Sequence, residues 1–236
     1  MRITTVYDNQ TLDPDLASAW GFACLVDDDL LFDTGRDAGR LLSNMERMGI
    51  DPMGIRTVVL SHAHGDHTGG LGGLLSTGAR PTVYALRSFP QQFKADVRSL
   101  TTLVEVAGPV EIRPGIHTTG EVGSHLVEQA LAVETADGLI VVTGCAHPGV
   151  VKMVRRAKES VGGKMAADVS VVIGGFHLGR ASRRQIRRII ADFRDLRVRK
   201  VAPCHCTGDR AMRMFAGEYG SDFVKVGVGR VITVGE

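Results

Sequence analysis

The 236-residue sequence lacks any apolar run of the roughly 18 residues that a membrane-spanning helix needs. It begins Met-Arg-Ile-Thr-Thr, which is not the start of a secretory signal. Neither sign of charge dominates, because 28 basic and 26 acidic side chains leave a net charge of +2. We therefore expect a cytoplasmic protein that does not enter a membrane and that has no global field to attract nucleic acid.

Cysteine is also scarce, and the four cysteines form no regular disulfide framework: Cys24, Cys145, Cys204 and Cys206. Two of them flank a histidine, His205. This usage favours a reducing compartment over a disulfide-stapled fold.

The chemistry of the chain is concentrated behind a β-branched apolar run at residues 57–60, which we interpret as a buried strand. Four potential metal ligands follow within six residues: His62, His64, Asp66 and His67. His62 and His64 are two residues apart on a turn, so both imidazoles can converge on one ion. Asp66 and His67 follow at the start of a helix, where a second ion can bind. Imidazole and carboxylate are ligands of divalent zinc, iron and manganese.

Three histidines further along the chain share one context: His147, His177 and His205. Each follows a β-rich run and has Gly or Pro near it in a turn. We interpret His147 and His205 as further metal ligands. For His177, metal binding and an ordinary surface role both remain open.

Apolar periodicity predicts an alternation of strands and helices without repeats or linkers. Strands are expected at 3–7 (an edge strand), 19–26, 30–33, 57–60, 81–86, 103–106, 110–112, 128–134, 139–143, 169–173, 200–202, 222–226 and 230–234. Helices are expected at 37–48, 69–75, 87–102, 150–161 and 182–196, with a short one before the last strands. The 87–102 segment is the most ambiguous, and Phe89, Pro90 and Phe93 there either pack in the core or line a substrate mouth.

The pattern His62-x-His64-x-Asp66-His67 resembles that of the metallo-β-lactamase superfamily. The resemblance implies an α/β fold, a four-layer αββα sandwich in one domain over residues 1–236, with a dinuclear metal site at a sheet edge. It also implies that Asp33, after the strand at 30–33, supports the metal loop by hydrogen bonding. A plain turn-forming Asp33 is the alternative.

The sequence departs from the common superfamily pattern after the strand at 139–143. Typical members carry Gly-Asp there, with a carboxylate that bridges the two metals, whereas this chain has Gly144-Cys145. We expect His147 to supply the third ligand of the first ion. Cys145 is then a substrate-side residue, a thiolate ligand or a small buried side chain, and these alternatives stay open.

Several motifs together look like one archaeal and bacterial branch of the superfamily, which contains the dihydropterin–ribofuranosylaminobenzene phosphate synthases of methanopterin biosynthesis. The motifs are Leu31-Phe-Asp-Thr-Gly35, the metal loop, Glu128-Gln-Ala-Leu131, Gly144-Cys-Ala-His-Pro-Gly149, Gly174-Gly-Phe-His-Leu178 and Pro203-Cys-His-Cys-Thr-Gly208.

These features lead to the hypothesis of a dinuclear metallohydrolase with two divalent ions, zinc first and manganese or iron as alternatives. One ion is held by His62, His64 and His147, and the other by Asp66, His67 and His205. A metal-bound hydroxide attacks a small, anionic ester, phosphoester or lactone, and Asp66 orients the water or takes its proton. The site is predicted to act on a small molecule, and an oligomer is possible.

Two other functions remain open. A transferase like the pterin-coupling synthase shares the motifs, and an iron redox or sulfur-oxidising enzyme shares the superfamily. A metal scaffold without activity is disfavoured by the complete ligand cluster.

Overall fold

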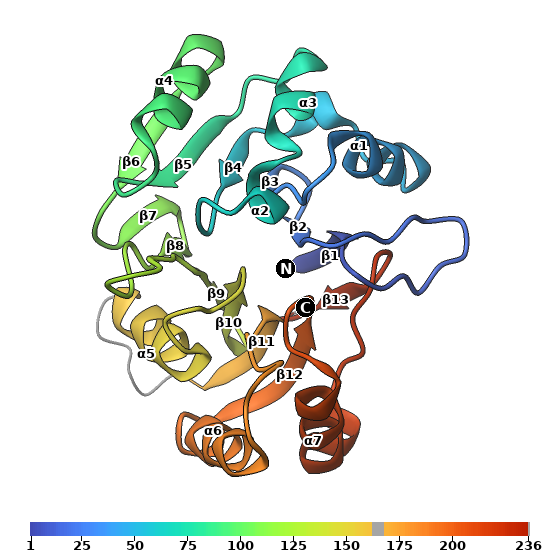
Figure 1. Cartoon of the computed structure of the whole chain (residues 1–236), viewed down its shortest axis with the longest axis vertical. Coiled ribbons are helices and arrows are strands. Elements are labelled where there is room, and N and C mark those ends of the chain that lie inside the picture. Colours follow the sequence, from blue (N-terminus) through green and yellow to red (C-terminus); the bar gives the residue numbers. More distant parts are fainter. Residues whose placement is uncertain (162–167, 236) are drawn as a thin grey trace. The chain divides into compact units, whose positions relative to one another are not determined.

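The computed structural model describes residues 1–161 and 168–235, and the chain divides into two compact units. Unit 1 comprises residues 1–107 and 226–233, and unit 2 comprises the remainder. Each unit is built on one β-sheet that carries its own helices (Figure 1). Within the described residues, no helix is both long enough and apolar enough to cross a bilayer.

Unit 1 contains a seven-stranded sheet in the order β13-β1-β2-β3-β4-β5-β6. The pairing is antiparallel from β13 through β1 and β2 to β3, and it is parallel from β3 to β6. The strands are β1 (Arg2–Tyr7), β2 (Ala23–Val26), β3 (Leu30–Phe32), β4 (Thr57–Val59), β5 (Thr82–Leu86), β6 (Leu103–Val106) and β13 (Val231–Thr233). The helices are α1 (Ala38–Arg47), α2 (Gly65–Thr68), α3 (Leu71–Ser76) and α4 (Gln91–Leu100), with a 3-10 turn at Pro52–Gly54.

The glycines after the metal loop let α3 approach its neighbours closely. A Cβ on Gly73 would lie 2.3 Å from the Cβ of Ala38, and one on Gly70 would lie 2.1 Å from the carbonyl oxygen of Thr34. Helices α1 and α3 accordingly lie side by side (Figure 1). Glycine costs a helix roughly 1 kcal/mol against alanine, and here that cost permits the backbone contact.

Unit 2 contains a six-stranded sheet in the order β12-β11-β10-β9-β8-β7. It is antiparallel from β7 to β10 and parallel from β10 to β12. The strands are β7 (Val110–Arg113), β8 (Ile116–Thr118), β9 (Leu131–Thr135), β10 (Gly138–Thr143), β11 (Val169–Gly175) and β12 (Val198–Cys204). The helices are α5 (Val150–Ser160), α6 (Arg183–Asp195) and α7 (Asp209–Tyr219), with a 3-10 turn at Gly220–Asp222.

An apolar core anchors the helices of unit 2 to its sheet. The rings of Phe176, Phe193 and Phe215 pack with centroids 5.5–5.8 Å apart, in the tilted and edge-to-face arrangements that aromatic rings prefer. Helix α6 begins with a capping box in which Ser182 and Gln185 satisfy each other's backbone N–H groups. The core therefore fixes the carboxyl ends of β11 and β12, from which two candidate metal loops start.

Most predicted elements are present, but three expectations fail. The strand at 3–7 is not an edge strand, because β13 pairs with β1 on its outer side. The strand predicted at 222–226 is absent, since Phe223 forms only a single bridge with Val201 after the 3-10 turn. Strand β8 was not predicted, because three residues are too few to show an alternating apolar pattern. In the first two cases a pairing between distant segments decides the outcome.

Candidate metal centre

The metal loop of unit 1 starts at the carboxyl end of β4, beside the carboxyl end of β3. These strands are parallel and pair Phe32 with Val59, so the residues that follow them lie at the same edge of the sheet. Asp33 follows β3 directly, and the loop of His62, His64 and Asp66 follows β4. The topology therefore brings the predicted carboxylate support to the predicted ligands.

Asp33 holds the metal loop through three hydrogen bonds. Its fully buried carboxylate accepts from the backbone N–H of Ser61 at 2.7 Å and from the Ser61 hydroxyl at 2.7 Å. It also lies 2.7 Å from Nδ1 of His67, which is fully buried. A buried carboxylate at that distance makes Nδ1 of His67 the protonated nitrogen. The lone pair of His67 is then on Nε2.

The same chain of hydrogen bonds assigns the tautomer of His62. The Ser61 hydroxyl donates its one proton to Asp33, so it accepts from Nδ1 of His62, 2.8 Å away. The lone pair of His62 is therefore on Nε2, which lies 3.0 Å from Nδ1 of His64. Nε2 of His67 in turn lies 3.7 Å from Oδ2 of Asp66. Both buried histidines thus carry their lone pair on Nε2, the nitrogen with which each would bind a metal ion.

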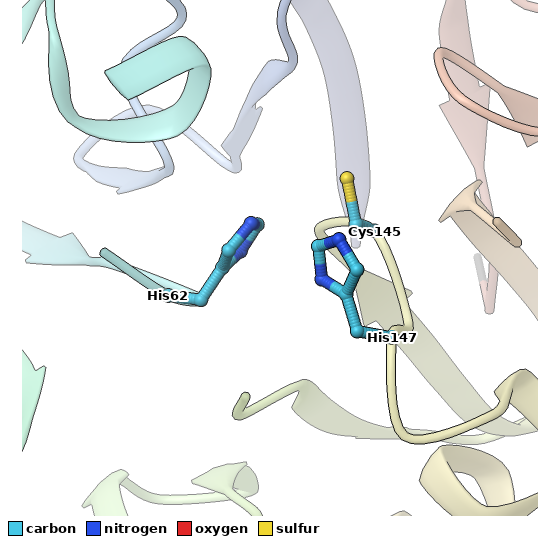
Figure 2. Close-up of side chains that lie close together, drawn as sticks. All are labelled: His62, Cys145 and His147. Atoms are coloured by element: carbon cyan, nitrogen blue, oxygen red, sulfur yellow. The ribbon is translucent and has the colours of Figure 1, made fainter. Parts of the chain in front are cut away.

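The candidate ligands of unit 2 follow three neighbouring parallel strands. Thr143 of β10 pairs with Gly174 of β11, which pairs with Pro203 of β12. The loops after these strands carry the Cys145–His147 segment, then His177, then His205 and Cys206. Cys145 and His147 project from the same loop (Figure 2). The three loops thus begin at one edge of the sheet.

Glu128 supports the Cys145–His147 loop much as Asp33 supports the loop in unit 1. Its carboxylate is fully buried and accepts hydrogen bonds from the backbone N–H groups of Cys145, at 3.0 Å, and of His147. Oε2 of Glu128 also lies 3.3 Å from Nδ1 of His147. The sequence contained Glu128 within a motif but gave it no role, because it precedes its partners by nearly twenty residues.

Cys145 lies at the centre of the unit 2 cluster. Its Sγ lies within 4.8 Å of a ring nitrogen of His147, His177 and His205, and also of Sγ of Cys206. The rings of His147 and His177 have centroids 4.4 Å apart. Sequence reasoning missed Cys206, although its position beside His205 was a signal.

The thiol of Cys206 is the most perturbed group of the cluster. Hydrogen bonding with Cys145, with a smaller contribution from His177, overcomes the effect of burial and lowers the pKa of Cys206 to about 4. The hydrogen bond with Cys206 in turn raises the pKa of His177, against the effect of its partial burial. The pair is therefore polarised toward a thiolate and an imidazolium.

Backbone strain concentrates in these loops. Asp33, Ala146, His177 and His205 all have positive φ angles between 50° and 58°. Non-glycine residues adopt this region at a cost, and such residues cluster at functional sites. The surrounding packing therefore holds both clusters in conformations that the local sequence disfavours.

The donor set fits a divalent cation, because imidazole nitrogens with assigned lone pairs and one carboxylate form the unit 1 cluster. Unit 1 brings His62, His64, Asp66 and His67 together with Asp33. Unit 2 brings Cys145, His147, His177 and His205 together. These are the features of a metal-binding α/β protein, with two mixed sheets and ligands at the carboxyl ends of parallel strands.

The family follows from comparison with known proteins. The model of the metallo-β-lactamase superfamily matches residues 15–144, which is more than half of the chain. The chain belongs to the metallo-β-lactamase superfamily, as its motifs indicated.

A curated relative and two solved structures extend this result. The 7,8-dihydropterin-6-methyl-4-(β-D-ribofuranosyl)-aminobenzene-5'-phosphate synthase of Methanocaldococcus jannaschii is 32% identical over 248 aligned positions, which cover 86% of this chain and 83% of that one. A metal-dependent hydrolase of the β-lactamase superfamily superposes over 100% of both chains with a TM-score of 0.84 and 28% identity. Human tRNase Z, short form, covers 99% of both chains with a TM-score of 0.65, and at 14% identity it shows the fold alone. The predicted metallo-β-lactamase fold is confirmed.

Proposed function

We propose that this protein is a metal-dependent hydrolase of a small anionic ester, phosphoester or lactone. The observation that carries the proposal is the hydrogen-bonded unit 1 loop, in which Asp33 and Ser61 leave Nε2 of His62 and of His67 as ligand nitrogens. The likeness to a metal-dependent hydrolase at 28% identity over the whole chain supports it.

The proposed ligand sets are the two groups of three residues that the sequence predicts. His62, His64 and His147 hold one ion, and Asp66, His67 and His205 hold the other. Zinc suits this mixture of imidazole and carboxylate, and manganese or iron are alternatives. Asp33 and Glu128 each fix the orientation of a ligand-bearing loop through buried hydrogen bonds. Because the family match at residues 15–144 extends from unit 1 into unit 2, we also propose one functional domain over residues 1–236.

Two divalent ions, when bound, would supply Lewis acidity toward a carbonyl or phosphoryl oxygen and would make a water acidic enough to react at neutral pH. Asp66 then has the role of orienting that water and accepting its proton, because it is the carboxylate among the proposed ligands. Asp33 continues to accept hydrogen bonds from Ser61 and His67, so that the ligand histidines hold their tautomers through the reaction.

Charge favours an anionic substrate. Two divalent ions bring four positive charges, and Asp66 is the one carboxylate among the six proposed ligands. Where Cys145 contributes no thiolate to these two ions, a relative with a bridging aspartate in its place would neutralise more of that charge. A phosphate or carboxylate on the substrate therefore finds a more positive site here.

Group transfer is the second candidate. The relative that is 32% identical over 86% of this chain is named a synthase, and this identity favours a similar reaction here. A transferase and a hydrolase of this fold differ in what attacks the activated centre, either a second substrate or water.

A substrate panel with matched variants tests the proposal. Purified protein of known metal content is assayed against small esters, phosphoesters and lactones, and against a pterin pyrophosphate with a phosphorylated aminobenzene riboside. We expect hydrolysis in the first group, and Asp66→Ala should lower kcat by about 100-fold or more while the protein stays folded. The exposed His125 provides a control, because His125→Ala should retain full activity.

Three outcomes are distinguished by this design. Turnover that requires both pterin and riboside substrates would replace hydrolysis by transfer. Full hydrolytic activity in Asp66→Ala would refute the role of that carboxylate. Active wild-type protein that holds no metal would refute the proposal as a whole.

A further inference from the structure

Three side chains of unit 2 form a cluster that the proposed ligand sets do not use. They are Cys145, His177 and Cys206, and one ligand atom from each lies within 4.8 Å of the other two. They come from three different loops, which follow β10, β11 and β12. Segments separated by about thirty residues each are thus brought together only by the parallel pairing of these strands.

The separation of these atoms is close to that of a ligand set around an ion. With Zn–S distances of about 2.3 Å and Zn–N distances of about 2.0–2.1 Å, tetrahedral geometry places neighbouring ligand atoms roughly 3.6–3.8 Å apart. The atoms here lie within 4.8 Å.

We propose that Cys145, His177 and Cys206 form a third cation site, which binds a thiophilic ion such as Zn²⁺ separately from the pair held by histidine and carboxylate. Two sulfur ligands and one imidazole select a soft ion, whereas carboxylate-containing sites favour harder ones. The site lies in unit 2 alone and goes beyond the proposed function. His177 is exposed, so a fourth position at the ion remains open to water or to an external ligand.

The surroundings hold the cluster in place before any ion binds. Thr207 next to Cys206 accepts a hydrogen bond from the backbone N–H of Phe176 at 3.1 Å and donates one to the carbonyl of Cys204 at 2.7 Å. These bonds tie the loop that carries His177 to the loop that carries Cys206. A Cβ on Gly175 would lie 2.7 Å from Sγ of Cys206 and 2.5 Å from the carbonyl oxygen of Gly144, so this glycine keeps room for the thiol. A site supported by such contacts binds its ion with little reorganisation.

Cobalt absorption tests this site independently of catalysis. The full-length protein is purified under reducing conditions, dialysed against a chelator and titrated with Co²⁺ alone. Thiolate ligands produce an intense sulfur-to-cobalt charge-transfer band in the near ultraviolet, and the histidine and carboxylate ligands of the other sites do not. We expect the band in wild type, with an intensity that corresponds to one Co²⁺ ion bound at this site per chain.

Variants assign the band to its residues. Cys206→Ala and Cys145→Ala should abolish it, and His177→Ala should weaken Co²⁺ binding at least tenfold. The matched control is Cys204→Ala, which removes the cysteine two positions before Cys206 and should leave the band intact. In wild type, bound Zn²⁺ should also protect Cys145 and Cys206 from alkylation, which mass spectrometry maps. This experiment does not depend on the folding of any variant.

Absence of the band in wild type, or its full retention in Cys206→Ala, would overturn the proposal. Equal alkylation of Cys206 with and without Zn²⁺ would do the same. Each of these readouts is independent of turnover, so a failure of the hydrolase proposal would leave the result on this site unchanged.

Discussion

At the scale of single residues, two buried carboxylates organise the candidate site. Asp33 binds Ser61 and His67 in unit 1, and Glu128 binds the backbone of Cys145 and His147 in unit 2. Both carboxylates are fully buried, where an unpaired charge would be costly. Their hydrogen bonds to the loops both satisfy the charge and fix the ligands.

Replacement of Asp33 by asparagine should weaken metal binding without removing a ligand. One carboxylate oxygen becomes an NH2 donor, so either the backbone N–H of Ser61 or the pair formed by the Ser61 hydroxyl and Nδ1 of His67 loses its acceptor, and the contacts that fix the ligand tautomers are weakened. Loss of such a supporting contact lowers metal affinity by about 10–100-fold. Competition with a chromogenic chelator measures the change, and the exposed Asp15→Asn is the control. Unchanged affinity in Asp33→Asn would show that its hydrogen bonds do not support the ligands.

At the scale of elements, the carboxyl end of the parallel strand β11 needs glycine for reasons of space. Gly174 has a φ of +122°, and a Cβ there would lie 1.9 Å from the carbonyl oxygen of Thr143. With a side chain at this position, β11 could not keep its register with β10. The turn that presents His177 therefore depends on a backbone that carries no Cβ.

Two glycine-to-alanine substitutions should have opposite effects on stability. Gly174→Ala should destabilise the protein by about 1–3 kcal/mol, because an overpacked site forces the backbone to shift. Gly217→Ala on the exposed side of α7 should stabilise it by about 0.5–1 kcal/mol, because nothing lies within 4 Å of its added Cβ and alanine favours a helix. Urea unfolding measures both. A stable Gly174→Ala protein would show that β10 and β11 do not approach as closely as described.

At the scale of the whole molecule, proposed ligands come from segments far apart in the chain, from His62 to His205. An ion that binds such a set binds the folded chain and not the unfolded one. Metal binding is therefore linked to global stability.

Metal removal should lower the melting temperature reversibly. At an ion concentration of 100 times Kd, binding stabilises the fold by about 2.7 kcal/mol, which for a chain of this size corresponds to roughly 5–10 °C. Thermal unfolding before chelation, after chelation and after addition of Zn²⁺ checks this. The double variant His62→Ala/His205→Ala should show a smaller response than wild type, because only the site of Cys145, His177 and Cys206 is left intact, and an equal response to wild type would show that the proposed pair of ions does not stabilise the fold.

The sequence by itself determined the unit 1 cluster, because its ligands occupy six consecutive residues behind one strand and local geometry brings them together. It also determined the amphipathic helix at 182–196, which is present as α6 (Arg183–Asp195), because periodicity and capping are local signals. Only the tertiary structure decided the partners of Glu128, the place of Cys206 beside Cys145, and the position of β13 outside β1. Each of these depends on pairing between segments that are distant in the chain, and no local pattern records such pairing.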